Sequence, residues 1–162
     1  MSNQQTELIV KMNLISWQMQ NKSFAELIDK LTDEQLLKET APGRNTGIYL
    51  LGHITAVSGD MFKILGLGEN MFTEYVEIFI KSPDKSGKIF PPVTDLKVAY
   101  HEVTNELNSQ FSKLSSEDWF SKHTAVSDEA FAKEPHRNKL NVLINRTTHI
   151  SYHVGQMVYL EI

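Results

Sequence analysis

Apolar residues recur at spacings of three and four over most of the chain, and this periodicity constrains the fold more than any other feature. Such spacing places the apolar side chains on one face of an α-helix. We expect four long helices over residues 6–31, 46–66, 93–114 and 138–162. Because a long connection separates the second helix from the third, the predicted fold is an all-α four-helix bundle with a long crossover between helices two and three.

The apolar positions also predict which face of each helix is buried. In the first helix the expected stripe is Leu8, Ile9, Met12, Ile15, Met19, Leu27 and Leu31. In the third it is Val93, Leu96, Tyr100, Val103, Leu107, Phe111 and Leu114. In the last it is Val142, Leu143, Ile150, Met157 and Leu160.

Two similar short segments follow the first and third helices, LTDEQL from Leu31 and LSSEDW from Leu114. In the first of them Thr32 is expected to cap a short helix, with Gln35 in the capping-box position. This similarity indicates that the chain consists of two helix pairs in succession. The alternative is that the two capping boxes arose by chance in an all-helical protein. Residues 41–45 are expected to form a loop, residues 70–92 a connection with one or two helical turns, and the segment around Pro135 a loop.

Length and composition limit the classes of function that are open to this chain. A chain of 162 residues suits a single domain over residues 1–162. The formal charge of −4 argues against nucleic acid as a partner. Without cysteines, any metal ion would be held by nitrogen and oxygen ligands. The sequence lacks the pattern of a signal peptide or a membrane span, so we expect a cytoplasmic protein.

Two histidines, His149 and His153, lie four residues apart in the last expected helix. Their rings are separated by only about 40° around the helix axis and project beside its apolar stripe. A single inward histidine is usually a hydrogen-bonded core residue, but two at this spacing can reach one metal ion. The glutamate of metalloprotease helices is missing between them, so that protease interpretation fails.

A third ligand is expected from the second helix, where His53 shares a face with apolar residues. Bundles build metal sites from inward side chains on facing helices. Asp60 follows His53 by two helical turns and is more simply interpreted as a solvated acid than as a further ligand. In the last helix, the candidates for binding an anionic group or orienting ligands are Arg146, Tyr152 and Gln156. The remaining histidines, His101, His123 and His136, are expected at the surface.

The motifs Gly52-His53-Ile54 and His149-xxx-His153-x-Gly155-Gln156, with LTDEQL and PGRNTGIYLLGHI, resemble those of the DinB/YfiT-like family of bacterial four-helix proteins. The resemblance extends over nearly the whole chain. It implies a metal-binding triad of His53, His149 and His153, a divalent ion that is commonly zinc or nickel, and a homodimer. It also implies, for some members, transfer reactions that use a low-molecular-weight thiol.

Three imidazoles leave open positions on a divalent ion, which suits chemistry better than a purely structural role. We therefore hypothesise thiol transfer to, or hydrolysis of, a small-molecule substrate, with the ion as Lewis acid. The alternative is a non-catalytic dimeric binding or stress-associated protein with a structural or vestigial metal site. Imidazole ligands alone do not identify the metal, because they suit zinc, nickel, copper and iron alike.

Overall fold

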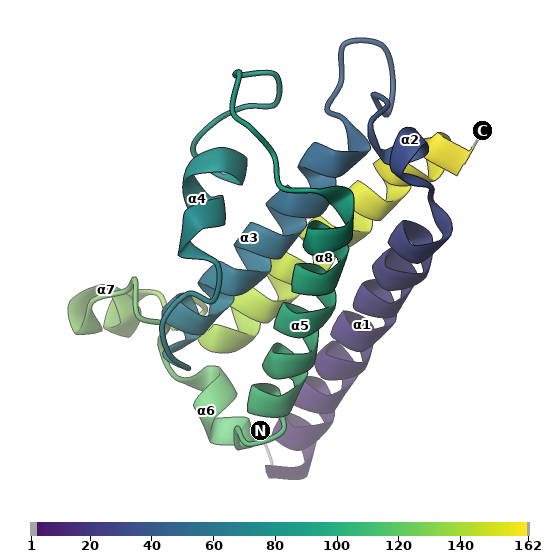
Figure 1. Ribbon diagram of the computed structural model, residues 1–162. Helices are drawn as coiled ribbons and strands as arrows, with labels where there is room; N and C mark the ends of the chain where they lie inside the picture. The colour runs from purple at the N-terminus through teal and green to yellow at the C-terminus, as the bar shows by residue number, and fades with distance from the viewer. Residues whose placement is uncertain (1–2, 162) are drawn as a thin grey trace.

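Four long helices form the body of the protein in the computed structural model, which describes residues 3–161 (Figure 1). They are α1 (Asn3–Lys30), α3 (Gly47–Leu65), α5 (Val93–Phe111) and α8 (Lys139–Met157). Helix α1 packs against α8 and α5, and α3 packs against α5 and α8, so the four helices enclose one core. Within residues 3–161 there is no strand beyond two isolated bridges. The expected all-α bundle is confirmed.

The connection from residue 66 to residue 92 is the long crossover of the bundle. Figure 1 shows α3 and α5 running in the same direction, opposite to α1 and α8, so the chain must return along the bundle between them. Helix α4 (Thr73–Phe79) lies within this connection and packs against α3. The expectation of one or two helical turns in this segment is therefore confirmed.

Short capped helices follow both α1 and α5. In α2 (Asp33–Leu36) and α6 (Ser116–Phe120), the capping residues Thr32 and Ser115 accept a hydrogen bond from the third backbone N–H of the helix, and both capping boxes are complete. These contacts satisfy N–H groups that the helix itself leaves unpaired. The final helix α8 continues as a 3-10 turn, η1 (Val158–Glu161), and the last residue of the expected helix lies outside the described residues.

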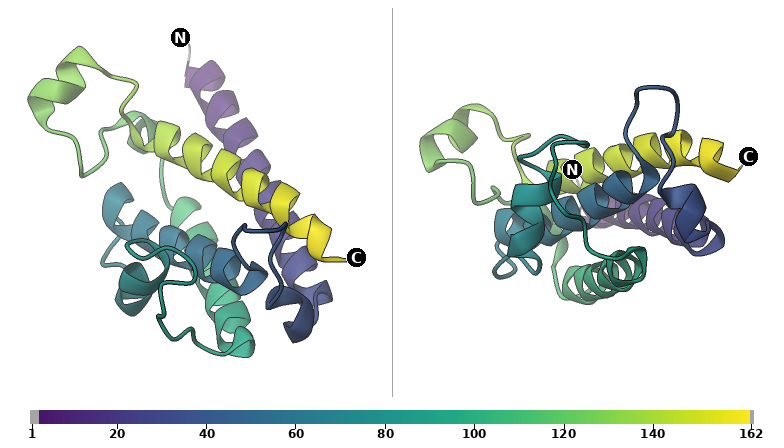
Figure 2. Two further views of the ribbon diagram at one scale, coloured as in Figure 1. Left: turned by 90° about the horizontal axis from the view of Figure 1, so that it is seen from above. Right: turned by 45° about the horizontal axis from the view of Figure 1, so that its top comes forward.

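One helix was not expected. The segment before Pro135 contains α7 (Asp128–Lys133), which Ser127 caps, and Figure 2 shows α7 projecting beyond the bundle. None of its residues is buried. Because apolar periodicity reports burial against a core, it gives no signal for a helix that buries nothing.

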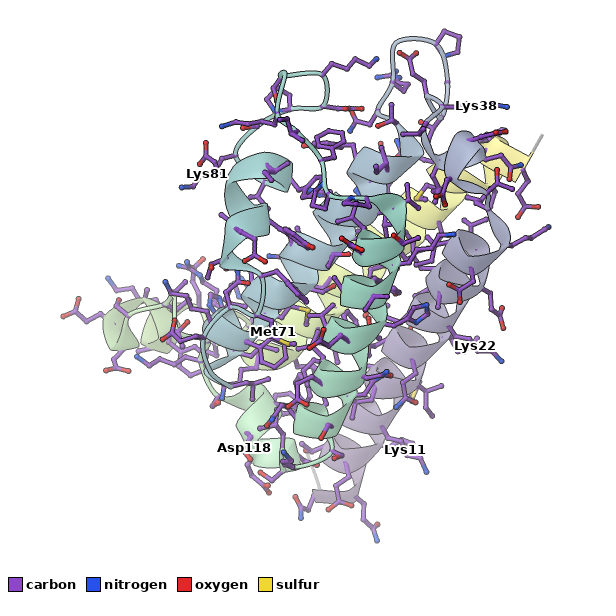
Figure 3. The ribbon with its side chains drawn as sticks, viewed as in Figure 1. Lys11, Lys22, Lys38, Met71, Lys81 and Asp118 are labelled. Carbon is purple, nitrogen blue, oxygen red and sulfur yellow. The ribbon has the colours of Figure 1, made fainter. Side chains whose placement is uncertain are left out.

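The expected apolar stripe of α1 is wrong over its first four turns. Leu8, Met12, Ile15 and Met19 are exposed, at 57%, 60%, 45% and 61% of their surface. The opposite face is buried instead, through Val10, Trp17, Phe24, Leu27 and Ile28. Both faces carry apolar residues at helical spacing, and the face with the large aromatic rings enters the core because those rings bury the most surface. Lys11 and Lys22 of the same helix point away from the bundle (Figure 3).

Helix α3 is buried on nearly all sides, and a glycine lets α4 approach it closely. A Cβ atom at Gly52 would lie 2.3 Å from ring carbons of Phe79. The Phe79 ring is itself fully buried and packs against Tyr49, Tyr75 and Phe90, so it has no free direction in which to retreat. Only glycine therefore fits at position 52 without moving α4.

The variant Gly52→Ala is expected to destabilise the fold by about 1–3 kcal/mol, because an extra methyl group in a filled core forces its neighbours apart. Urea unfolding, followed by circular dichroism, measures this free energy of unfolding.

Gly155→Ala is the matched control, since no atom outside its own helix lies within 4 Å of a Cβ placed there. Alanine in an exposed helix interior is favoured over glycine by up to about 1 kcal/mol. Equal effects of the two substitutions would contradict the close packing of α3 and α4.

Candidate metal centre

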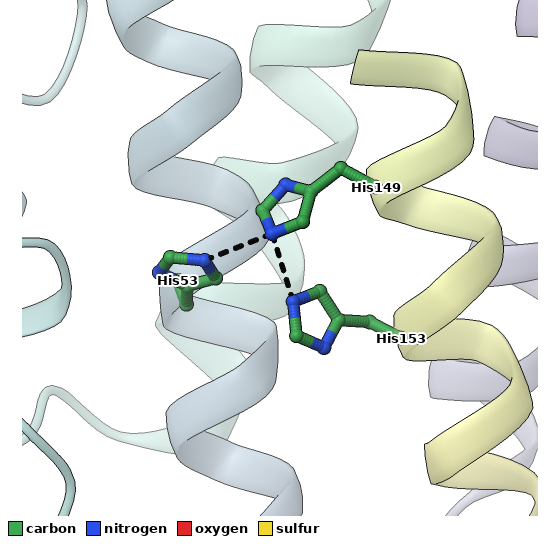
Figure 4. Close-up of side chains that lie close together, drawn as sticks. All are labelled: His53, His149 and His153. Atoms are coloured by element: carbon green, nitrogen blue, oxygen red, sulfur yellow. Dashed lines mark hydrogen bonds between the residues drawn. The ribbon is translucent and has the colours of Figure 1, made fainter. Parts of the chain in front are cut away.

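Three histidines from two helices meet at one point inside the bundle. His53 projects from α3, and His149 and His153 project from successive turns of α8 (Figure 4). The Nε2 atom of His149 lies 3.2 Å from Nε2 of His53 and 2.9 Å from Nε2 of His153. One ligand atom from each ring lies within 4.8 Å of the others, so the group can hold a metal ion. The structure thus brings together the three residues that the sequence singled out.

The outer nitrogen atoms of two rings have partners that fix their orientation. His53 Nδ1–H donates to the carbonyl oxygen of Phe79 at 2.7 Å, and His153 Nδ1–H donates to Gln156 Oε1 at 2.7 Å. Because the carbonyl and amide oxygens accept hydrogen bonds, they select the tautomer in which Nε2 carries a lone pair. His149 Nδ1 is buried and has no hydrogen-bond partner among residues 3–161. The Nε2 lone pairs of His53 and His153 are therefore aimed at the common centre.

This spacing fits a metal ion. A tetrahedral ion with nitrogen ligands at about 2.0–2.1 Å requires the ligand nitrogens to lie roughly 3.3 Å apart. The two observed separations, 3.2 Å and 2.9 Å, are close to that value. Neutral imidazoles whose lone pairs converge repel one another unless a proton or a cation lies between them, and a divalent cation satisfies all three at once.

The surroundings keep these imidazoles uncharged. Burial, together with the electrostatic effect of His153, His53 and Arg146, lowers the pKa of His149 to about 4. Burial also lowers the pKa values of His53 and His153, against the opposing effect of their hydrogen bonds. Histidines that are neutral at physiological pH need not lose a proton before they bind a metal ion.

Gln156 orients the ring of one histidine of the triad. Its side-chain oxygen accepts from His153, and its Nε2 donates to Tyr152 Oη at 3.2 Å. Tyr152 itself is mostly exposed, and its ring packs edge-on against that of His153 with the ring centroids 5.1 Å apart. The two side chains form a short chain of hydrogen bonds from the surface to the ring of His153.

Arg146 lies one turn before His149 and is partly buried, and its Nε atom has no hydrogen-bond partner. Among the described residues no carboxylate lies within 4.0 Å of its guanidinium, so Arg146 forms no ion pair with them. Burial lowers the pKa of Arg146, and the negative charge of Asp60 opposes this change from longer range. Asp60 is also outside the histidine cluster, in agreement with its interpretation as a non-ligand.

The other three histidines do not join the triad. His101 Nε2 lies 3.0 Å from a carboxylate oxygen of Asp29 near the surface, and His136 is exposed. His123 departs from the expectation of a surface residue, because it is half-buried and its Nδ1 atom is enclosed without a partner. The loop around it folds back onto α3 through Thr124, whose N–H donates to the carbonyl oxygen of Ile64, and this long-range contact left no signal in the sequence.

The metal-free protein is expected to lose stability as the pH falls from about 6.5 toward 4, because the unfolded chain binds protons at His149 that the folded chain excludes. His149→Gln removes this titration, so the free energy of unfolding should fall less steeply with acid in the variant. Urea unfolding with a chelator present, at several pH values, measures the difference.

His136→Gln is the matched control, because it replaces an exposed histidine on the loop before α8. Its pH dependence should follow that of the unaltered protein. Parallel curves for the unaltered protein and His149→Gln would show that the triad is not held neutral by its surroundings.

Comparison with known proteins agrees with the fold. None of the helices within residues 3–161 is long and apolar enough to cross a membrane. No curated protein matches the chain. The model of the DinB superfamily matches residues 17–157, a stretch that begins in α1, ends in α8 and contains all three histidines of the cluster. The chain belongs to the DinB superfamily.

Proposed function

We propose that His53, His149 and His153 bind a divalent metal ion, zinc or nickel, and that the protein uses it as a Lewis acid in thiol transfer or hydrolysis on a small molecule. The observation that carries this proposal is the convergence of the three Nε2 atoms at 3.2 Å and 2.9 Å. Membership of the DinB superfamily supports it independently of the geometry.

The number of ligands favours chemistry over a structural role. Structural zinc sites are usually closed by four protein ligands, whereas catalytic sites keep a position open. Among the described residues only three histidines belong to the cluster. When bound, a divalent ion at such a site lowers the pKa of a water or thiol beside it, so that the nucleophile is available at neutral pH.

The residues around the triad supply the remaining requirements. The hydrogen bonds from His53 to Phe79 and from His153 to Gln156 hold the ligands in place before the ion arrives. The Arg146 guanidinium, whose positive charge reaches both His53 and His149, stabilises an anion formed at the open side. Because the chain has no cysteine, a thiol has to come from a separate cosubstrate.

Replacement of any one of the three ligands is expected to weaken zinc binding more than about 100-fold; the variants are His53→Ala, His149→Ala and His153→Ala. Gln156→Met is expected to weaken zinc binding by about 10–100-fold, because the hydrogen bond that fixes the tautomer and orientation of His153 is lost. Competition titration with a chromogenic chelator, on protein purified without a metal-affinity tag, measures these affinities.

His101→Gln is the control, because His101 bonds to Asp29 away from the triad. The same variants also test catalysis, through the zinc-dependent rate at which 3-mercaptopropionate displaces chloride from 1-chloro-2,4-dinitrobenzene. Unchanged zinc affinity in all three alanine variants would show that the site is wrong. Tight zinc binding without acceleration of thiol attack or ester hydrolysis would favour the alternative of a non-catalytic binding protein.

We also propose that the protein forms a homodimer through the exposed apolar stripe of α1. Leu8, Met12, Ile15 and Met19 are separated by four, three and four residues, which is the spacing of a seam between two packed helices. A second copy carries the same stripe, and a two-fold arrangement of the two α1 helices would cover both.

Met12→Glu combined with Ile15→Glu is expected to convert the dimer to a monomer, because the substitutions place four carboxylates in one seam. Sedimentation velocity measures the mass. Val98→Glu, at an apolar residue of α5 that is 65% exposed, is the control and should leave the dimer intact. A monomeric unaltered protein would contradict the proposal.

A further inference from the structure

A polar pocket of about 240 Å³ opens beside the triad. It is lined by Gly43, Arg44 and Asn45 of the loop before α3 and by Tyr152, His153 and Gln156 of α8. His153 therefore belongs both to the triad and to the wall of this pocket. A ligand in the pocket would contact the ring whose Nε2 atom is directed at the common centre.

The loop that carries Arg44 is held in place by hydrogen bonds. The backbone N–H of Gly43 donates to Glu39 Oε2 at 2.7 Å, and Arg44 N–H donates to the carbonyl oxygen of Ala41 at 2.9 Å. Lys85, from the crossover, bonds to both the Glu39 carboxylate and the carbonyl oxygen of Arg44. Gly43 has a φ of +75°, which glycine adopts without strain. The pocket wall is thus a built feature.

The charges around the pocket favour an anion. Among the described residues, Arg44 is the one residue of the lining with a permanent charge, and no acidic side chain lines the pocket. The nearest acid of the loop, Glu39, is bound to Lys85, and this contact lowers its pKa. No described carboxylate forms an ion pair with Arg44. Its guanidinium is free to bind a carboxylate through two parallel hydrogen bonds.

We infer that this pocket binds the carboxylate of the thiol cosubstrate through Arg44 and thereby places its sulfur beside His153. The inference rests on the proposed function and adds the substrate class: a small thiol with a carboxylate group. Asn45, Tyr152 and Gln156 offer neutral donors and acceptors for the rest of the molecule. The pocket is smaller than the roughly 300 Å³ at which drug-sized sites begin, so it suits a compact metabolite.

Two thiols that differ at one end test the inference. With zinc-loaded protein, 3-mercaptopropionate should bind more tightly than 2-mercaptoethanol, which lacks the carboxylate. Arg44→Met is expected to weaken 3-mercaptopropionate about tenfold at low salt and to leave 2-mercaptoethanol unchanged, because one charge-assisted contact is lost. Isothermal titration calorimetry measures both affinities. Zinc affinity should remain that of the unaltered protein.

Arg137→Met is the matched control, since that arginine pairs with Glu134 outside the pocket and its loss should change neither thiol affinity. Equal affinity of the unaltered protein for the two thiols, or a loss in Arg44→Met that is the same for both, would overturn the inference.

The inference and the proposed function fail separately. If zinc does not bind, the proposed function fails. The pocket can then still be tested by titrating propionate into the metal-free protein and following the nuclear magnetic resonance spectrum. Shifts at Asn45 that depend on Arg44 would support carboxylate binding there. If zinc and both thiols bind but neither affinity depends on Arg44, the proposed function stands and the inference is wrong.

Discussion

The convergence of three imidazoles between α3 and α8 is the interaction on which the rest of the site depends. Polar rings in a core cost free energy unless they find partners, and here each Nε2 atom faces another Nε2 atom at 3.2 Å or 2.9 Å. The inner nitrogen atoms of the three rings thus face one another across the interface between α3 and α8.

The crossover has a chemical role as well as a topological one. Gly52 lets Phe79 approach α3 closely, and the carbonyl oxygen of Phe79 then accepts the Nδ1–H of His53. Tyr49 strengthens the same junction, because its hydroxyl donates to the carbonyl oxygen of Ser82 at 2.9 Å. The direction of the His53 lone pair is thus set by a segment that lies 26 residues further along the chain.

Local spacing explains which features the sequence could predict. His149 and His153 share a face because four residues make about one helical turn, and the caps at Thr32 and Ser115 depend on neighbours three residues away. Burial of α1 was mispredicted because Leu8 and Trp17 both fit helical spacing and only the packed bundle selects between their faces. The Phe79 carbonyl and the Arg44 pocket depend on long-range packing, which periodicity does not encode.

Two arginines place positive charge near the triad of a protein that is acidic overall. The net charge is −4, but Arg146 lies one turn before His149 on α8, and Arg44, on the loop before α3, lines the pocket together with His153 and Gln156. Neither arginine has a carboxylate partner within ion-pair distance among the described residues. Net charge governs solubility and nonspecific association, whereas these local charges govern what enters the site. A divalent ion would add further positive charge between them, so the occupied site would favour an anionic ligand more strongly than the empty one.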